Sequence, residues 1–159
     1  MKLTAKGRLA VTSLVDLALN SNGDKPVCLS DIARRQNISL SFLEQIFLSL
    51  KNKGIVKSVR GPLGGYLFAR QPDGVMIIDV IRAIDEKLKI TGCNGVDFGC
   101  VAHNRKTKCL THNLWNKLTN HIFFFLNSIS IQDVTMDRFD VILAKQNMEK
   151  INDNFQIKL

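Results

Sequence analysis

The first third of the chain shows a helical hydrophobic pattern followed by a clear break. Apolar residues recur at helical spacing and predict a first helix over about residues 4–20. Its apolar stripe consists of Leu9, Ala10, Leu14, Val15, Leu17 and Ala18. The segment that follows contains Gly23 and Pro26, which interrupt a helix, so we expect a loop there.

Two further helices are predicted on either side of a short turn. The first, DIARRQ (31–36), has Ser30 in front of it as the expected N-cap. Asn37 then tolerates the left-handed backbone that a tight turn needs.

The next segment, SFLEQIFLSLKNKG, carries the boundary signals of a second helix. Ser41 and Glu44 match the spacing of a capping box, with Ser41 as the cap. Lys51 and Lys53 lie in the last turn, where the helix dipole favours cations, and Gly54 is the expected stop.

Together the two helices predict a helix-turn-helix motif. The buried stripe of the second helix would be Leu43, Ile46, Phe47 and Leu50. Its outward face would carry Ser41, Glu44, Gln45 and Asn52, polar side chains of the kind that read base edges in a major groove. An ordinary helical hairpin with a solvated outer face is the alternative.

A β-hairpin is predicted directly after this second helix. Two short runs rich in β-branched or aromatic residues, 55–60 and 66–69, flank a Gly/Pro turn. Gly64 in that turn lets the backbone approach another surface, and Arg60 at its edge could grip phosphate or enter a minor groove. A hairpin in this place favours a winged helix-turn-helix, a mostly α fold with a small β wing.

Two more helices are predicted, over about residues 76–88 and from Thr111 to about Ile129. The second has an apolar stripe of Leu114, Trp115, Leu118, Ile122, Phe125, Leu126 and Ile129. Phe123 and Phe124 widen this stripe beyond what one core requires, which predicts a second partner, most simply another copy in a homodimer. His121 is expected in the core or at that interface.

The pattern divides the chain into four parts. These are a DNA-binding domain (1–88), a Cys/His loop (89–110), a dimerisation helix (111–135) and a tail (136–159) without an assigned role. The net charge of +8 supports this division because residues 1–70 hold 11 basic and four acidic residues, whereas residues 71–159 hold 11 and 10. A basic front half favours contact with a polyanion such as DNA.

The segment CNGVDFGCVAHNRKTKCLTH (93–112) crowds together three of the four cysteines. We predict a cytoplasmic protein, because no signal-peptide or membrane-spanning pattern is present and the longest apolar runs are far too short. Reduced, clustered thiols there are more often metal ligands or catalytic groups than disulfides. The fourth, Cys28, lies among apolar residues and is expected to be buried.

The candidate ligands allow more than one metal site. Cys100, His103, Cys109 and His112 form a set that tetrahedral zinc accepts. Cys93, Cys100, Cys109 and His112 would instead hold a [2Fe–2S] cluster. Spacing does not choose between them. A nucleophilic Cys–His pair is a third interpretation, but no oxyanion motif, phosphate loop or paired carboxylates accompany it, so we do not expect an enzyme.

Four motifs in order, MKLTAKGRLAV, SLSFLEQIF, VRGPLGGYLF and CLTHNLW, resemble the IscR family of winged-helix bacterial repressors. The resemblance runs from Met1 to about Val134 and implies a homodimeric DNA-binding regulator. It also implies a [2Fe–2S] cluster whose state selects promoters, commonly those of cluster-assembly genes. The positions that match its cluster ligands are Cys93, Cys100, Cys109 and His112.

The same resemblance implies that Glu44 discriminates between types of DNA site, and that Ser41, Gln45 and Arg60 contact DNA.

The sequence departs from the family pattern in two places. The cysteine intervals are longer than the family's, which adds His103 as a candidate ligand, and Leu63 stands where the wing tip would carry glycine. A zinc-binding winged-helix repressor is the second interpretation, and a small electron carrier the third.

Overall fold

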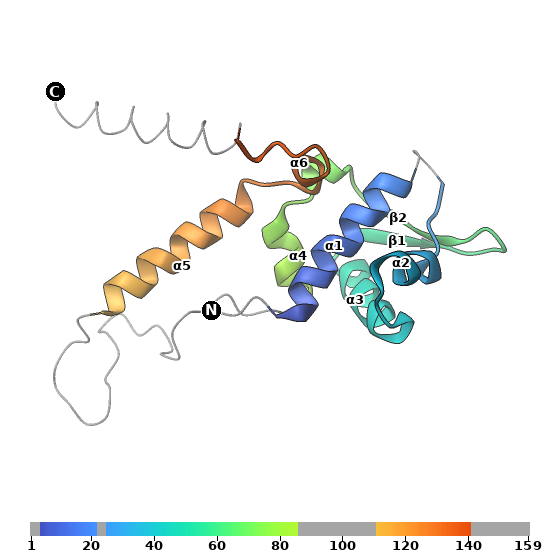
Figure 1. Cartoon of the computed structure of the whole chain (residues 1–159), viewed down its shortest axis with the longest axis horizontal. Coiled ribbons are helices and arrows are strands. Elements are labelled where there is room, and N and C mark those ends of the chain that lie inside the picture. Colours follow the sequence, from blue (N-terminus) through green and yellow to red (C-terminus); the bar gives the residue numbers. More distant parts are fainter. Residues whose placement is uncertain (1–3, 22–24, 86–110, 141–159) are drawn as a thin grey trace.

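The computed structural model describes residues 4–21, 25–85 and 111–140, and within them a helical domain with one small sheet (Figure 1). The predicted fold class is confirmed. The helices are α1 (Ala5–Asn20), α2 (Leu29–Gln36), α3 (Leu40–Asn52), α4 (Ile77–Ala83), α5 (His112–Asn127) and α6 (Ile131–Thr135), with the 3₁₀ helix η1 at Pro72–Gly74. The strands β1 (Val56–Val59) and β2 (Gly65–Phe68) pair antiparallel, with Val56 opposite Phe68 and Val59 opposite Gly65.

A single apolar core joins α1 to the helices around it. Helix α1 packs against α2, α3, α4 and α6, which places it at the centre of the domain (Figure 1). The predicted stripes of α1 and α3 supply much of the core, and the largest fully buried side chains include Leu14, Leu17, Leu43, Ile46, Phe47 and Leu50. Phe47 also meets Tyr66 of β2 edge-to-face, with ring centroids 5.0 Å apart, so the same core supports the hairpin.

The helix-turn-helix forms as predicted, with a different pattern of capping. Asn37 ends α2 in the left-handed conformation (φ 53°, ψ 49°), as expected. The cap of α3 is Ser39, whose Oγ accepts a hydrogen bond from the Phe42 N–H at 3.4 Å. The predicted capping box of Ser41 and Glu44 is therefore wrong. The extended backbone of Ser39 comes directly after the turn and starts the helix two residues earlier.

The start of α2 also differs from the prediction. The helix begins at Leu29 with Cys28 at the N-cap position, so Ser30 lies inside the first turn. Cys28 is exposed rather than buried. Its Sγ lies 3.0 Å from Ser30 Oγ, and hydrogen bonds from the Ser30 side chain and backbone lower the pKa of the thiol. The apolar neighbours misled the prediction because they turn into the core while position 28 faces outward.

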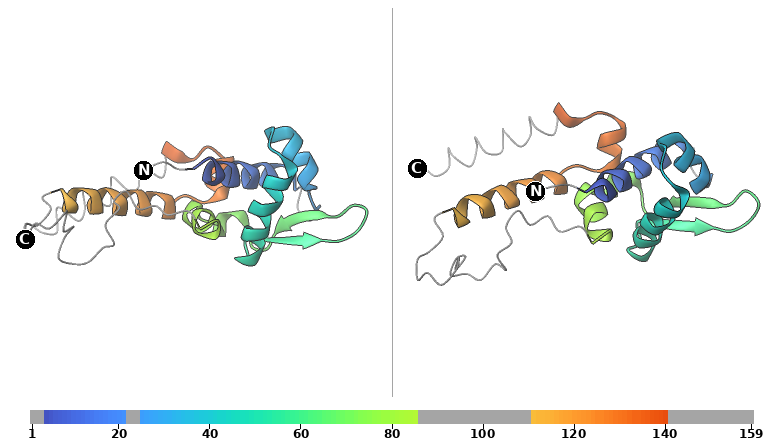
Figure 2. Two further views of the ribbon diagram at one scale, coloured as in Figure 1. Left: turned by 90° about the horizontal axis from the view of Figure 1, so that it is seen from below. Right: turned by 60° about the horizontal axis from the view of Figure 1, so that its bottom comes forward.

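The chain leaves the domain after α4 and returns to it before α6. Helix α4 ends at Ala83, short of the predicted end, because Asp85 takes a left-handed conformation (φ 56°); residues 86–88 lie outside the described residues. Helix α5 extends away from the other helices (Figures 1 and 2). Hydrogen bonds from Ile77 N to Ile129 O and from Ile131 N to Val75 O, both 2.9 Å, then fasten the returning chain.

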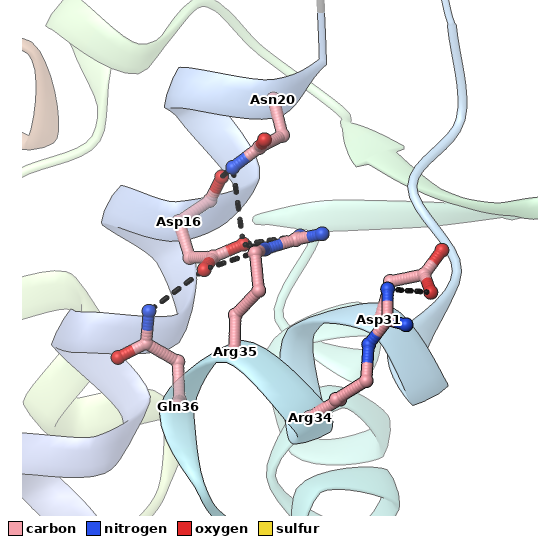
Figure 3. A network of polar contacts seen from close by, with 6 residues as sticks. All are labelled: Asp16, Asn20, Asp31, Arg34, Arg35 and Gln36. Carbon is pink, nitrogen blue, oxygen red and sulfur yellow. Dashed lines mark hydrogen bonds and ion pairs between the residues drawn. The ribbon is translucent and has the colours of Figure 1, made fainter.

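Polar contacts fix α2 against α1 (Figure 3). Asp16 of α1 is buried, and both of its carboxylate oxygens accept hydrogen bonds from the Arg35 guanidinium, at 3.0 and 3.1 Å from Nε. Gln36 Nε2 donates a further hydrogen bond at 2.7 Å, and Asn20 Nδ2 another at 3.3 Å. Because Arg35 and Gln36 close α2 immediately before the turn, this carboxylate fixes the end of α2 from which the turn to α3 leaves.

These contacts also determine how Asp16 titrates. Burial raises the pKa of the carboxyl, but hydrogen bonds from Arg35 and Gln36, together with the Arg35 charge, outweigh it and hold the pKa below its ordinary value. A carboxyl with a lowered folded-state pKa stabilises the fold above its unfolded-state pKa. That contribution is lost as the pH falls through the folded-state pKa.

We expect Asp16→Asn to lower the free energy of unfolding by about 1–3 kcal/mol at neutral pH, measured by urea denaturation. The loss is smaller than for a fully buried pair because the Arg35 side chain remains 33% exposed. The difference from the wild type should shrink below about pH 4. Asp31→Asn is the matched control, because it breaks the exposed Asp31–Arg34 pair and should change stability by less than about 0.5 kcal/mol. Equal effects of the two variants would contradict this account.

Candidate nucleic-acid interface

The polar residues predicted to read DNA lie together on the exposed face of α3. Ser41, Glu44 and Gln45 are all exposed, while the apolar stripe of the same helix is fully buried. Helical spacing places position 48 on the same face, and there Leu48 is 57% exposed. The sequence pattern did not single out Leu48. It adds an apolar group, of the kind that contacts thymine methyls, to a set of hydrogen-bonding side chains.

The hairpin is joined to α3 by a polar contact that the sequence did not reveal. Lys51 Nζ donates a hydrogen bond to Ser58 Oγ of β1 at 2.8 Å. Arg60 follows β1 directly and is exposed, as are Lys53 and Lys57. The end of α3 and the wing thus share one cationic surface, which is suited to phosphate groups.

Two glycines of the wing have a structural role that involves no ligand. A Cβ on Gly64 would lie 2.4 Å from the carbonyl oxygen of Val59, and a Cβ on Gly65 would lie 2.3 Å from that of Val27. Val27 bonds Tyr66 in both directions, through N–H···O contacts of 3.0 and 2.8 Å. The base of the wing is therefore clamped to the segment that leads into α2, and the turn needs Gly64 whether or not DNA approaches it.

The predicted metal ligands fall largely outside the described residues. Cys93, Cys100, His103 and Cys109 lie there, whereas His112 is the first residue of α5. Within the described part of the chain, no three His, Cys, Asp or Glu residues gather in a way that could hold a metal ion. The positive end of the α5 dipole lies at His112, which favours anionic groups nearby.

Helix α5 presents a long apolar face to solvent. Leu114 is 59% exposed, and Trp115, Leu118 and Phe125 are exposed beside it. On the other side of the helix, the Phe123 ring lies 4.8 Å from the Arg82 guanidinium of α4, and Leu126 packs against the core. Ile129, which belongs to the predicted apolar stripe of this helix, lies beyond its last residue and is buried in the core. His121 is exposed and so is not in the core, whereas its predicted alternative place at a dimer interface stays a prediction.

No helix in the described ranges combines the length and apolar character needed to cross a bilayer.

Comparison with known proteins agrees with this architecture. Residues 3–137 match the Rrf2 family, described as iron-dependent transcriptional regulators. The chain is 47% identical over 138 residues to the HTH-type transcriptional regulator IscR of Xenorhabdus nematophila, covering 87% of this chain and 81% of the relative. It is 45% identical over 152 residues to IscR of Erwinia tasmaniensis, covering 95% and 89% of the two chains.

Solved structures of transcriptional regulators share the fold of this chain. T. potens IscR superposes with a TM-score of 0.68 at 32% identity, covering 89% of this chain and 90% of that one. CymR, the global cysteine regulator of B. subtilis, superposes with a TM-score of 0.70 at 29% identity, covering 86% and 97%.

The clamp at the base of the wing gives a direct test. Gly65→Ala should lower the free energy of unfolding by about 1–3 kcal/mol, because the new methyl group meets backbone that cannot move aside easily. Gly74→Ala is the matched control: its Cβ would meet nothing within 4 Å, so we expect a change of less than about 0.5 kcal/mol. Thermal or urea unfolding distinguishes the two variants. Equal stabilities would contradict a close approach of the Gly65 backbone to Val27.

Proposed function

The chain belongs to the Rrf2 family of transcriptional regulators, and we propose that it adjusts its DNA binding to the supply of iron–sulfur clusters through a [2Fe–2S] cluster. Its relatives are named transcriptional regulators, and like them it is a DNA-binding regulator rather than an enzyme. The single observation that carries the proposal is the combination of an IscR-like winged helix-turn-helix with three clustered cysteines and a histidine. We expect it to act in the cytoplasm, on genes of cluster assembly.

The proposed ligands are Cys93, Cys100, Cys109 and His112. Thiolates are the soft donors that iron–sulfur clusters require, and four protein ligands satisfy two irons. His112 contributes a position at the amino end of α5, where backbone N–H groups favour a negatively charged centre. When bound, such a cluster supplies a redox-sensitive link between residues 93–109 and the start of α5.

The proposed DNA contacts follow from the exposed groups of α3 and the wing. Ser41, Glu44 and Gln45 would meet base edges in the major groove, with Glu44 discriminating between site types. Arg60 would reach phosphate or the minor groove, with Gly64 holding the turn that presents it. We assign these roles to the DNA-binding domain, residues 1–88.

A homodimer is the proposed assembly. The exposed stripe on α5 includes Leu114, Leu118 and Phe125, spaced so that they lie on one side of the helix. A second copy can cover this stripe by two-fold symmetry, and the two α3 helices would then read half-sites about one DNA turn apart. Residues 89–110, the Cys/His loop, lie in sequence between α4 and α5, so cluster binding there would shift one DNA-binding domain relative to the other. A coupling of ~1–3 kcal/mol would change promoter affinity roughly 5–150-fold.

The cluster is tested by anaerobic purification followed by iron, sulfide and zinc analysis and a visible spectrum. We expect about two irons and two sulfides per chain. The colour should be lost or shifted in His112→Ala and kept in His103→Ala, the matched control from the same segment. One zinc without sulfide or colour would overturn the cluster and leave a zinc-binding regulator, the second interpretation.

The dimer is tested with Leu118→Glu. A charge in an apolar interface is strongly unfavourable, so this variant should sediment as a monomer and lose roughly tenfold or more in operator affinity. Asn120→Glu, which adds the same charge at an exposed position of the same helix, should remain dimeric. Monomeric wild-type protein in sedimentation analysis would contradict the assembly.

A further inference from the structure

The tip of the wing is apolar and fully presented to solvent. Gly64 N donates a hydrogen bond to Gly61 O at 2.9 Å, which closes a four-residue turn with Pro62 and Leu63 at its two central positions. Leu63 is 90% exposed, the largest exposed fraction among the described large hydrophobic residues. It contributes almost nothing to the core, so its apolar surface is available for burial by a partner.

The turn holds Leu63 in a defined place. Pro62 restricts the backbone at the first central position, and Gly61 (φ 127°) and Gly64 provide the conformation and space that a side chain would obstruct. The strands behind it are paired over four residues each and clamped through Tyr66 to Val27. The hairpin projects beyond the helices in both views of Figure 2. The backbone of a leucine at its end therefore reaches a partner with little further loss of conformational freedom.

The surroundings of the tip favour a polyanion as that partner. Arg60 precedes the turn and is exposed. Exposed Lys25 lies in the groove beside Leu63, which Arg35 and Asp31 also line, so cations outnumber carboxylates there. Phosphates on either side of a minor groove would meet these cations while the apolar tip enters between them. Proteins that bind the minor groove often insert leucine or proline against base steps, which unstacks and kinks the duplex.

We propose that Pro62 and Leu63 form an apolar wedge that enters the minor groove next to the major groove occupied by α3. This inference rests on the DNA-binding role and adds a specificity element to it. The wedge favours operators whose flanks contain pyrimidine–purine steps, because these unstack most easily. The wedge would contribute to sequence preference through the ease of unstacking, because the apolar side chains of Pro62 and Leu63 make no hydrogen bond to a base.

The test uses anaerobically purified full-length protein and an operator selected from a random duplex library by the wild type. Leu63→Ala should bind this operator about 5–20-fold more weakly, from the loss of apolar burial. The slope of log affinity against log salt should stay unchanged, because leucine displaces no counterions, whereas Arg60→Ala should reduce that slope by about one. Leu19→Ala, an exposed leucine on α1, is the matched control and should bind normally.

Unstacking is measured with 2-aminopurine placed at successive flank positions of the same operator. The wild type should raise the fluorescence at one position per half-site, and Leu63→Ala should not. Binding of Leu63→Ala within about twofold of the wild type, or no unstacking by the wild type, overturns the wedge but leaves the regulator intact. Failure of the wild type to select any sequence would instead overturn the DNA-binding role and the wedge with it.

Discussion

The buried carboxylate of Asp16 is the contact on which the geometry of the surface formed by α3 and the wing depends. It lies in α1, at the centre of the core, and takes hydrogen bonds from the last two residues of α2. A charge in that position is stable only if it is fully partnered, so α2 has one favourable angle against α1. Since the turn to α3 starts at the next residue, the exposed face of α3 takes its direction from the same contact.

The wing is oriented by a second constraint of a different kind. Here backbone meets backbone, because Gly65 has no side chain to keep β2 away from Val27. The hydrogen bond from Lys51 to Ser58 and the Phe47–Tyr66 ring contact then join the hairpin to α3. Helix α3 and the wing are consequently joined into one surface, and under the proposed function both would approach DNA together.

Hydrophobic periodicity predicted α1, α4, α5 and the buried stripe of α3, because side-chain burial follows the period of each element. Capping and turn residues indicated α2 and the hairpin, whereas the five-residue helix α6 was not predicted. Periodicity could not predict the Asp16 network, since Asp16 lies on α1 while its partners Arg35 and Gln36 lie on α2, and each looks like an ordinary surface residue in the sequence. The cap of α3 was misplaced because Ser39 and Ser41 are both good caps, and only the length of the turn decides between them. The exposure of Cys28 likewise depends on which way one helix start faces. The cluster ligands rest on residue chemistry and family resemblance, since most lie outside the described residues.

The return of the chain before α6 has a consequence for synthesis. Ile131 is fully buried and Ile129 nearly so, and both join backbone around Val75 and Ile77, more than 50 positions earlier. The ribosome delivers α1 to α4 and the wing first, but their core stays open until these two isoleucines have emerged. Helix α5 is synthesised after α4 and before these two isoleucines. The domain therefore completes its packing only when α5, the proposed dimerisation helix, is already present. A truncated product ending before Ile129 would therefore lack a closed core.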